Sequence, residues 1–440
     1  MSKYESVSRQ AGKRRWTILL GGFLLSLVGG MSYAWGSFVV PLVNDWGWTA
    51  AEATLPLTVL IIVFALTMIP AGWLQDKFGP RKTATVGAVL FLVGYSLAGL
   101  LRYIRSHTWL ILTYGIVVGL ACGLTYACIA PTARKWFTDR PGFAVSTSVM
   151  GFGLAAVLLA PLKKLMINAM GVDGTLFVLG GFAFAAAIVG ASLLKNPPDD
   201  WTPPQRAESK IRIRPPMLKK TPEVTSSVTP RVTPNVISEV TPRVTPNVTP
   251  REFIRTPIFY GLWLALAAVI GGGLTAIGLL SAFGELELGL SPTQATLAVS
   301  LFSLVNGLGR PFAGALADRI GTMRVMMIVY ILQSVVFLTF PWVATNYPLL
   351  LLCSIFLGAG YAVTFALFPV VVAARFGTRH LGVNYGLVFS AFGMGAVTSF
   401  LGTTLLDTTG SFTPAFLLAG ITTAVGLILL IALRKKLTIQ

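Results

Sequence analysis

The chain has 440 residues, of which 54% are hydrophobic and only 11% are charged. Soluble proteins carry about 25% charged residues, so this composition excludes an ordinary soluble enzyme and indicates a membrane protein. The formal net charge of +18 does not indicate nucleic-acid binding, because the basic residues lie in one linker and in short segments between apolar runs.

Twelve apolar runs are each long enough to cross a bilayer as a helix. They are predicted at residues 16–43, 53–75, 83–103, 108–131, 143–167, 173–195, 257–284, 293–317, 322–344, 347–373, 383–406 and 412–433. The alternating pattern that is typical of membrane β-barrels does not occur. The predicted fold class is therefore all-α integral membrane, with twelve transmembrane helices in two six-helix halves.

Basic residues set the predicted orientation. They follow the N-terminus and the even-numbered runs, whereas the opposite loops hold only Arg102, Arg105, Lys163 and Lys164. By the positive-inside rule, both termini and the central linker are cytoplasmic. The predicted location is the plasma membrane, which is the inner membrane in a bacterium.

A segment rich in Pro, Thr, Val and Arg separates the halves. Residues 1–195 form the N-terminal half, 196–255 the linker and 256–440 the C-terminal half. The octamer Thr-Pro-Arg-Val-Thr-Pro-Asn-Val occurs at 229–236 and again at 241–248. Regular proline prevents helix formation, so we expect a solvated low-complexity tether. Contact of its basic residues with anionic lipid is the alternative.

A short motif occurs once in each half, after the second and eighth runs. Residues 72–82 and 314–324 share the pattern Gly-x3-Asp-Lys/Arg-x-Gly, followed by a basic residue. The pattern predicts a helix end closed by glycine, with basic side chains at the negative end of the helix dipole. Ion pairs to neighbouring helices would make these motifs a cytoplasmic latch between the halves. The latch candidates are Asp76, Arg81, Asp318 and Arg319.

The recurrence of this motif in two six-helix halves resembles the signature loops of the major facilitator superfamily. The resemblance implies that the halves enclose a central site near the middle of the membrane and expose it to each side in turn.

Arg310 is the one strongly basic residue that the sequence places well inside a predicted span. An arginine there costs at least about 2.5–3.5 kcal/mol on insertion scales, and intramembrane charges usually mark functional sites. Because no acid lies within a turn of it, the predicted partner is a mobile anion. Asn306, one turn earlier, supplies a further hydrogen bond. A structural arginine bound to helix carbonyls is the alternative.

Aromatic residues in other spans are candidates for the wall of this site. Tyrosines occur singly in the first, fourth and tenth spans, and phenylalanines occur at helical spacing in the tenth and eleventh. Together they predict a cage around a small apolar tail, with ordinary helix packing as the alternative. The candidates are Tyr33, Tyr126, Tyr361, Phe365, Phe389 and Phe392.

The sequence around Arg310 narrows the resemblance. Asn-Gly-x-Gly-Arg-Pro-x-x-Gly at 306–314 is similar to the eighth helix of the oxalate/formate antiporter family and the related monocarboxylate transporters. Residues 32–36, 368–369 and 384–386 carry further similarity. The resemblance covers nearly the whole chain outside the linker, and it implies a carboxylate carrier that works by alternating access.

Two departures from these families concern substrate and coupling. Oxalate carriers have a second cation, a lysine, where Phe392 stands, so one arginine here favours a monocarboxylate such as L-lactate or pyruvate over a dianion. Animal monocarboxylate transporters have an aspartate where Asn306 stands and a lysine where Ser37 stands. The remaining proton-coupling candidates are Glu285 and Glu287, which follow a glycine run that is expected to bend the seventh helix. A solvated helix end is the alternative for both.

We therefore expect a secondary transporter of small monocarboxylates with proton symport, or alternatively a carboxylate exchanger. The expected partners are the anion, a proton and the lipid bilayer, with no nucleic acid and no obligate protein partner. The spans carry no catalytic constellation and the cysteines no metal-ligand spacing, so neither an enzyme nor a cofactor or metal site is predicted.

Overall fold

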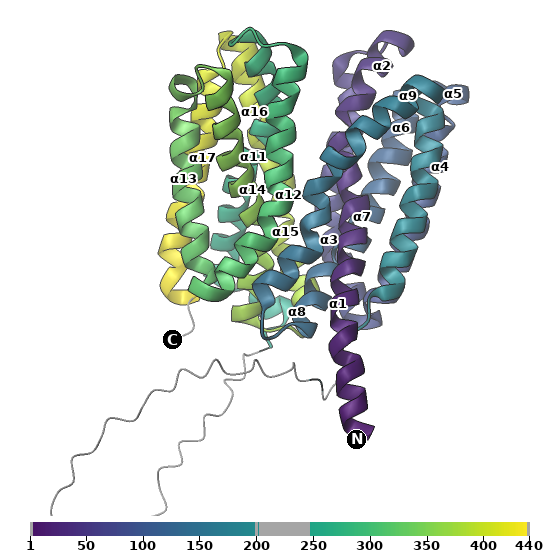
Figure 1. Cartoon of the computed structure of the whole chain (residues 1–440), viewed down its shortest axis with the longest axis vertical. Coiled ribbons are helices and arrows are strands. Elements are labelled where there is room, and N and C mark those ends of the chain that lie inside the picture. The colour runs from purple at the N-terminus through teal and green to yellow at the C-terminus, as the bar shows by residue number, and fades with distance from the viewer. Residues whose placement is uncertain (1–2, 199–200, 202–246, 438–440) are drawn as a thin grey trace, which may run out of the picture.

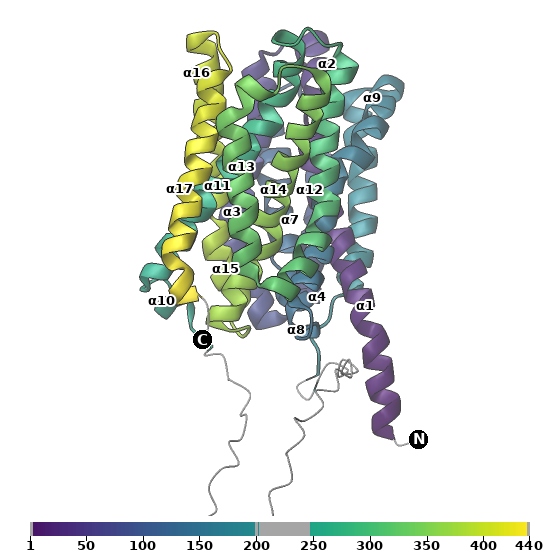
Figure 2. The same cartoon turned by 60° about the vertical axis from the view of Figure 1, so that its left-hand side comes forward.

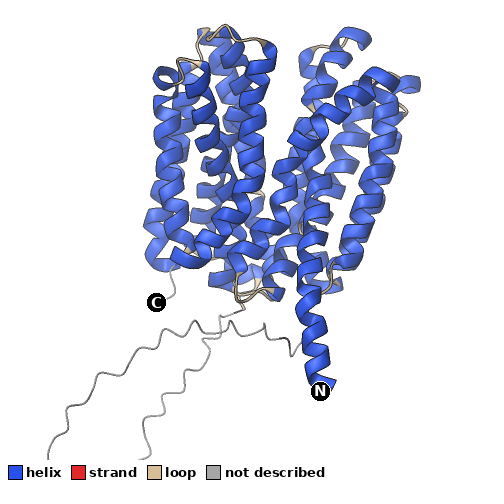
Figure 3. Ribbon diagram, in the orientation of Figure 1, coloured by secondary structure: helices blue, strands red, loops and turns tan. Residues whose placement is uncertain are grey.

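The computed structural model describes residues 3–198, 201 and 247–437, and none of these residues lies in a strand (Figure 3). The described helices form two bundles that stand side by side (Figure 1). The start of the first helix, both ends of the linker and the end of the last helix lie at one end of the molecule, which we call the linker end. We call the opposite end the far end.

The N-terminal bundle follows the predicted order of spans, with interruptions. Its elements are α1 (Lys3–Gly30), η1 (Met31–Ala34), α2 (Gly36–Trp46), α3 (Ala50–Phe78), α4 (Pro80–Gly99), α5 (Leu101–Ile104), α6 (His107–Leu110), η2 (Ile111–Val118), α7 (Gly119–Tyr126), α8 (Ile129–Trp136) and α9 (Pro141–Leu193). The continuous run α9 contains the fifth and sixth spans, which meet at Gly171, where φ is 75°.

The C-terminal bundle lies beside it, and a view turned by 60° shows its long helices in front of those of the other half (Figure 2). Its elements are α10 (Pro250–Phe253), α11 (Pro257–Leu286), α12 (Pro292–Ile320), α13 (Thr322–Val343), α14 (Tyr347–Phe376), α15 (Leu381–Phe389), α16 (Ala391–Thr409) and α17 (Thr413–Leu437).

The described helices include 11 that are long and apolar enough to cross a membrane. The helix α12 is not among them, although it has 29 residues. It carries Asn306 and Arg310 in its middle and both are buried, so its polar groups face protein instead of lipid. With α12 included, the described helices make the twelve predicted passes.

The second and eighth spans, α3 and α12, have matching ends. Each begins with a capping box, formed by Thr49 with Glu52 and by Ser291 with Gln294. Each ends at a glycine with positive φ, 88° at Gly79 and 96° at Gly321. The predicted glycine-closed helix end is confirmed in both halves.

In three of the interrupted spans, the break lies next to a candidate site residue. The first span breaks at η1, which contains Tyr33; the fourth breaks after Tyr126; and the eleventh breaks at Ser390, next to Phe389. Breaks in transmembrane helices are tolerated where the backbone is buried in protein or lines a cavity.

The glycine run does not interrupt the seventh helix, because α11 is continuous from Pro257 to Leu286. Its glycine run instead allows close packing. A Cβ atom on Gly273 would lie 2.0 Å from Cδ2 of Tyr361, and one on Gly271 would lie 2.4 Å from Cβ of Thr398. The missing side chains therefore make room for a site residue.

Most of the linker and the first octamer repeat lie outside the described residues. At its C-terminal end, the Val248 amide donates to the Phe376 carbonyl (3.0 Å) and the Asn384 side chain donates to the Val248 carbonyl (3.0 Å). The helix α10 follows at once, so the helix-free segment ends earlier than the predicted residue 255.

A candidate anion site between the two halves

Arg310 is fully buried at the interface between the bundles. Its Nε donates to the carbonyl and side-chain oxygens of Asn306 (3.2 and 3.3 Å), and Nη2 donates to the same side-chain oxygen (3.1 Å). Nη1 crosses to the other half and donates to the Val149 carbonyl of α9 (2.8 Å). No described acidic residue forms a salt bridge with the guanidinium.

Some N–H groups of the guanidinium are not used by the hydrogen bonds described above. It carries five N–H groups, and the contacts above leave one hydrogen on each terminal nitrogen unused. Two parallel N–H donors match a carboxylate bidentately. Asn306 orients the guanidinium through its side-chain oxygen. A hydrogen bond from its amide nitrogen to an anion stays a prediction. The carbonyl contacts are also those expected of a structural arginine, so ligand binding by Arg310 stays a prediction.

The predicted aromatic residues gather around this guanidinium. Cζ of Arg310 lies 4.9 Å from the ring centroid of Phe365. The Phe365 ring lies 5.7 Å from Phe392, 6.0 Å from Phe389 and 5.0 Å from Tyr361. The tenth and eleventh spans thus place one continuous aromatic wall beside a desolvated cation, where cation–π attraction is strongest.

The N-terminal half completes this wall with residues that the sequence analysis missed. Phe152 stacks on Phe365 at 6.4 Å, and Phe64 lies 5.2 Å from Phe389. Tyr126 packs against both Phe64 and Phe389 at 5.5 Å. The Tyr126 hydroxyl is buried, forms none of the hydrogen bonds described above, and lies close to both Arg310 and Tyr385. Its position makes it a candidate neutral donor for an anion at Arg310.

Two tyrosines close the far side of the site. The hydroxyls of Tyr33 and Tyr361 lie 3.1 Å apart and form a hydrogen bond between the halves. Tyr33 also packs edge-on against Phe152, with centroids 4.8 Å apart. This tyrosine pair separates Arg310 from the space above it.

Above the tyrosine pair lies a cavity between the halves, which we call the vestibule. Its upper part has a volume of about 700 Å³ and its lower part about 230 Å³. Tyr33 and Ser303 line the lower part, and Lys164 and Asn168 line the upper part. Both parts share Gly36, Ser37, Ala156, Val157, Thr296 and Ser300. Since these residues belong to α2, α9 and α12, the vestibule lies toward the far end (Figure 1).

The linker end is closed by matching contacts of the two motifs. Asp76 of α3 accepts from the amides of Gly382 (3.3 Å) and Val383 (3.2 Å), where α15 begins. Asp318 of α12 accepts from the amides of Gly142 and Phe143, where α9 begins, each at 2.8 Å. Each aspartate thus sits at the N-terminus of a helix in the opposite half, where the helix dipole favours negative charge.

The first glycine of each motif allows this approach. A Cβ atom on Gly72 would lie 2.2 Å from the Gly382 carbonyl oxygen, and one on Gly314 would lie 2.2 Å from the Gly142 carbonyl oxygen. Any side chain there would force the helices apart, so the glycine and the aspartate four residues later act together.

The predicted ion pairs of the latch are absent among the described residues. The aspartates accept from backbone amides. Lys135 attracts Asp76 and Arg134 attracts Asp318 electrostatically, but neither pair is within salt-bridge distance. Arg81 and Arg319 are exposed and form no salt bridge with any described residue. Helix N-termini already supply aligned donors, so no cation is needed for a close contact.

The basis for a proton-coupling role of Glu285 and Glu287 is also missing. Both side chains are exposed at the end of α11, and Glu285 accepts a hydrogen bond from Ser281 (3.1 Å). A proton-coupling role was predicted for these residues only if their carboxyl groups are partly buried, and the structure shows both exposed.

A second buried cation lies in the N-terminal half. Lys163 lies within α9 and not in the predicted far-end loop. It is only 1% exposed, and its Nζ donates to the Met31 carbonyl (2.7 Å). Nζ also lies 5.2 Å from the Phe38 ring centroid. Lys163 thus holds the break in the first span, and the adjacent Lys164 faces the vestibule.

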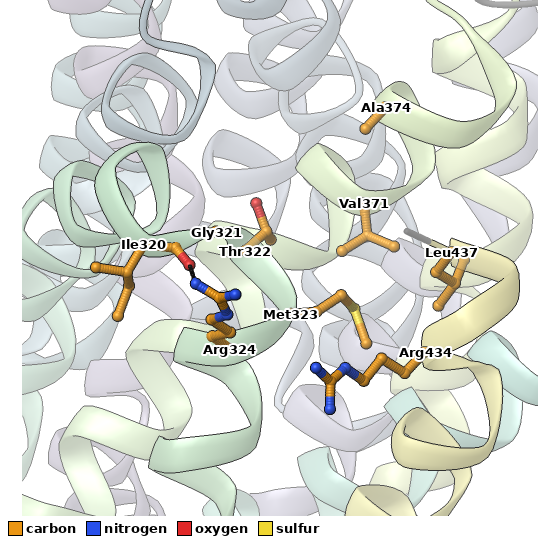
Figure 4. A pocket seen from close by; sticks show the side chains of 9 residues that line it. All are labelled: Ile320, Gly321, Thr322, Met323, Arg324, Val371, Ala374, Arg434 and Leu437. Carbon is orange, nitrogen blue, oxygen red and sulfur yellow. Dashed lines mark hydrogen bonds between the residues drawn. The ribbon is translucent and has the colours of Figure 1, made fainter. Parts of the chain in front are cut away.

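A further cavity, of about 350 Å³, lies at the linker end (Figure 4). Its lining includes Arg324, which donates to the Ile320 carbonyl (3.4 Å), and Arg434. Every lining residue belongs to the C-terminal half, so this cavity is not on the path between the halves.

Comparison with known proteins agrees with this architecture. The sequence model of the Major Facilitator Superfamily matches residues 18–286 and 262–438. The oxalate:formate antiporter of Oxalobacter formigenes is 26% identical over 384 residues, which cover 86% of this chain and 82% of the antiporter. Human monocarboxylate transporter 12 is 24% identical over 433 residues, which cover 96% of this chain and 80% of that protein.

Solved structures share the fold. The Escherichia coli fucose:proton symporter FucP superposes with a TM-score of 0.66 at 14% identity, covering 96% of this chain and 98% of FucP. A bacterial homologue of the iron transporter ferroportin gives a TM-score of 0.64 at 17% identity, covering 96% and 99% of the two chains. Because the family model spans nearly all of both bundles, the chain belongs to the major facilitator superfamily.

Proposed function

We propose that the protein is a secondary active transporter of small monocarboxylates, such as L-lactate and pyruvate, and that it works by alternating access. The observation that carries this proposal is the buried guanidinium of Arg310, which no described acid neutralises and which lies between the halves below a vestibule. Two relatives named for carboxylate transport support the same substrate class.

The surroundings of Arg310 favour one carboxylate with a short apolar tail. A bidentate carboxylate would use the two unused N–H groups, and Tyr126 would donate a further hydrogen bond. The rings of Phe365, Phe389 and Phe392 offer the rest of the ligand only apolar contacts. A second carboxylate would face these rings without a cation, which is strongly unfavourable in a dry site.

The transport step follows from the two ends of the interface. With the termini in the cytoplasm, the linker end is the closed cytoplasmic side and the vestibule opens outward. An anion reaching Arg310 neutralises its charge, which lowers the free-energy cost of enclosing both groups in a dry site. The halves then rock, the aspartates leave their helix N-termini, and the site opens inward.

Proton symport is the proposed coupling, although neither Glu285 nor Glu287 is placed to carry the proton. Exchange of one carboxylate for another is a second candidate. It is favoured by the lack of an acid in contact with Arg310 in the described parts of the chain, and by the relative named as an antiporter.

Uptake of radiolabelled pyruvate or lactate into proteoliposomes tests the proposal. Concentrative uptake driven by an inward proton gradient into vesicles without internal carboxylate supports symport. Uptake that requires internal carboxylate and ignores the proton gradient supports exchange. Failure of both, with formate and acetate also inactive, contradicts carboxylate transport.

A further inference from the structure

Lys164 is a cation that no described residue neutralises. Its side chain is exposed and lines the upper vestibule, and no described residue forms a salt bridge with it. No described Asp or Glu lines either part of the vestibule. A cavity lined by one sign of charge between low-dielectric walls concentrates counter-ions.

The rest of the vestibule lining suits a carboxylate. Neutral donors come from both halves, and none of the described acids faces them. These donors are Ser37, Asn168 and Ser300; the Thr296 hydroxyl already donates to the Pro292 carbonyl (2.7 Å). The lining also includes apolar surface from Ala156, Val157 and Ile167, which a short aliphatic tail can contact. One cation, several neutral donors and an apolar wall repeat the chemistry of the site around Arg310.

The two sites are well separated. Lys164 lies about 22 Å along α9 from Val149, the residue whose carbonyl accepts from Arg310, at 1.5 Å per residue. The tyrosine pair Tyr33–Tyr361 lies between them. The distance exceeds the Debye length of about 8 Å at physiological ionic strength, so Arg310 contributes little attraction at the level of Lys164.

We propose that Lys164 is the anchor of an outer carboxylate-binding site in the vestibule, which captures the substrate before the tyrosine pair admits it to Arg310. This inference rests on the proposed function for the identity of the anion. The adjacent Lys163 has a different role, because its ammonium is buried against the Met31 carbonyl and does not reach the vestibule.

A cysteine reporter tests the outer site without requiring transport. Val157 lines both parts of the vestibule, and the native cysteines Cys122, Cys128 and Cys353 are all buried. In a Val157→Cys protein, two methanethiosulfonates are compared, one carrying a negative sulfonate and one a positive trimethylammonium group. The rate of each is divided by its rate with a free thiol in solution. We expect this relative rate to be higher for the sulfonate. Adding Lys164→Gln should lower this preference by about 3- to 10-fold, whereas Lys164→Arg should retain it.

The matched control is Arg102→Gln, which removes an exposed cation from the same end of the protein without touching the vestibule lining. Pyruvate should slow the sulfonate reaction in Val157→Cys, and the concentration needed should rise at least about threefold with Lys164→Gln. An unchanged reagent preference and unchanged protection by pyruvate would overturn the proposal.

Transport kinetics separate this inference from the proposed function. In Lys164→Gln we expect KM for uptake to rise about 3- to 10-fold and to lose part of its salt dependence, while kcat stays within about twofold. If the wild type shows the preference for the sulfonate reagent and the protection by pyruvate but no uptake, the result contradicts transport and still supports the outer site. Uptake in the wild type with an unchanged KM in Lys164→Gln would contradict the outer site alone.

Discussion

The two ends of the interface between the halves are closed in different ways. At the linker end, two aspartates each accept from backbone amides of the opposite half, and glycines bring the backbones into contact. Toward the far end, a single pair of tyrosine hydroxyls closes the site beneath an open vestibule.

The difference indicates which end resists opening. Four hydrogen bonds to ionised groups are each worth about 1.5–3 kcal/mol, whereas one neutral hydroxyl pair contributes about 0.5–1.5 kcal/mol. The linker end is therefore the strong closure and the tyrosine pair the weak one, with Arg310 between them. A ligand that enters from the vestibule has only the weak closure to displace.

The largest expected effect is that of Arg310→Lys. An ammonium cannot reproduce the planar two-pronged contact, so carboxylate uptake should fall by about 100-fold or more. Arg319→Lys, an exposed change on the same helix, is the control and should keep wild-type rates. Wild-type uptake in Arg310→Lys would mean that the guanidinium only ties the halves together.

The double substitution Asp76→Asn and Asp318→Asn should weaken the closure of the linker end. Loss of both charges weakens four amide contacts, so the linker end should open at least about tenfold more often. The readout is labelling of a Ser146→Cys reporter, because Ser146 is buried at this interface. Asp407→Asn, an exposed change at the far end, is the control. Unchanged labelling would show that the aspartates do not hold this end closed.

Phe392→Lys tests the choice of one carboxylate over two. A second cation in the aromatic wall should improve oxalate binding by about tenfold and weaken pyruvate binding. Phe392→Leu removes the ring without adding charge and should improve neither. Competition of each acid with labelled pyruvate is the measurement, and no gain for oxalate would contradict the assignment of Phe392 to the ligand wall.

The smallest effect is expected for Tyr33→Phe, which removes one hydroxyl of the weak closure and keeps its ring. The lost hydrogen bond of about 0.5–1.5 kcal/mol should speed access from the vestibule by about three- to tenfold. The measurement is the rate at which pyruvate reaches the site in stopped-flow tryptophan fluorescence. Slower access would mean that the pair guides the ligand instead of blocking it.

The spans, the two halves, the repeated motif and the central cation could be predicted from the sequence, because each depends on local hydropathy or on a single charged residue within an apolar run. Arg310 is conspicuous for this reason. The aromatic wall was only half predicted: Phe64 and Phe152 lie beside Phe365 and Phe389 through tertiary packing, and a chain with 27 phenylalanines offers no local signal that distinguishes them.

Other features depend on contacts between the halves. The aspartates of the motif bind helix N-termini that are distant in sequence, so the predicted ion pairs with basic side chains were wrong. The prediction placed Lys163 with Lys164 in a loop, but only Lys164 is exposed and Lys163 is buried. Only the break in the first span, which exposes the Met31 carbonyl, explains how one lysine of the pair is buried.

The most direct test of the central claim is ligand-induced stabilisation of the purified protein across a panel of carboxylates. A ligand at 100 times its Kd stabilises the folded state by about 2.7 kcal/mol, which raises Tm measurably. We predict that pyruvate or L-lactate raises Tm of the wild type and of Arg319→Lys, and that the rise is much smaller in Arg310→Lys, which keeps only the outer site at Lys164. Oxalate should have the weaker effect. An equal rise of Tm in Arg310→Lys, or no rise with any monocarboxylate, would contradict the assignment of Arg310 as the anion site.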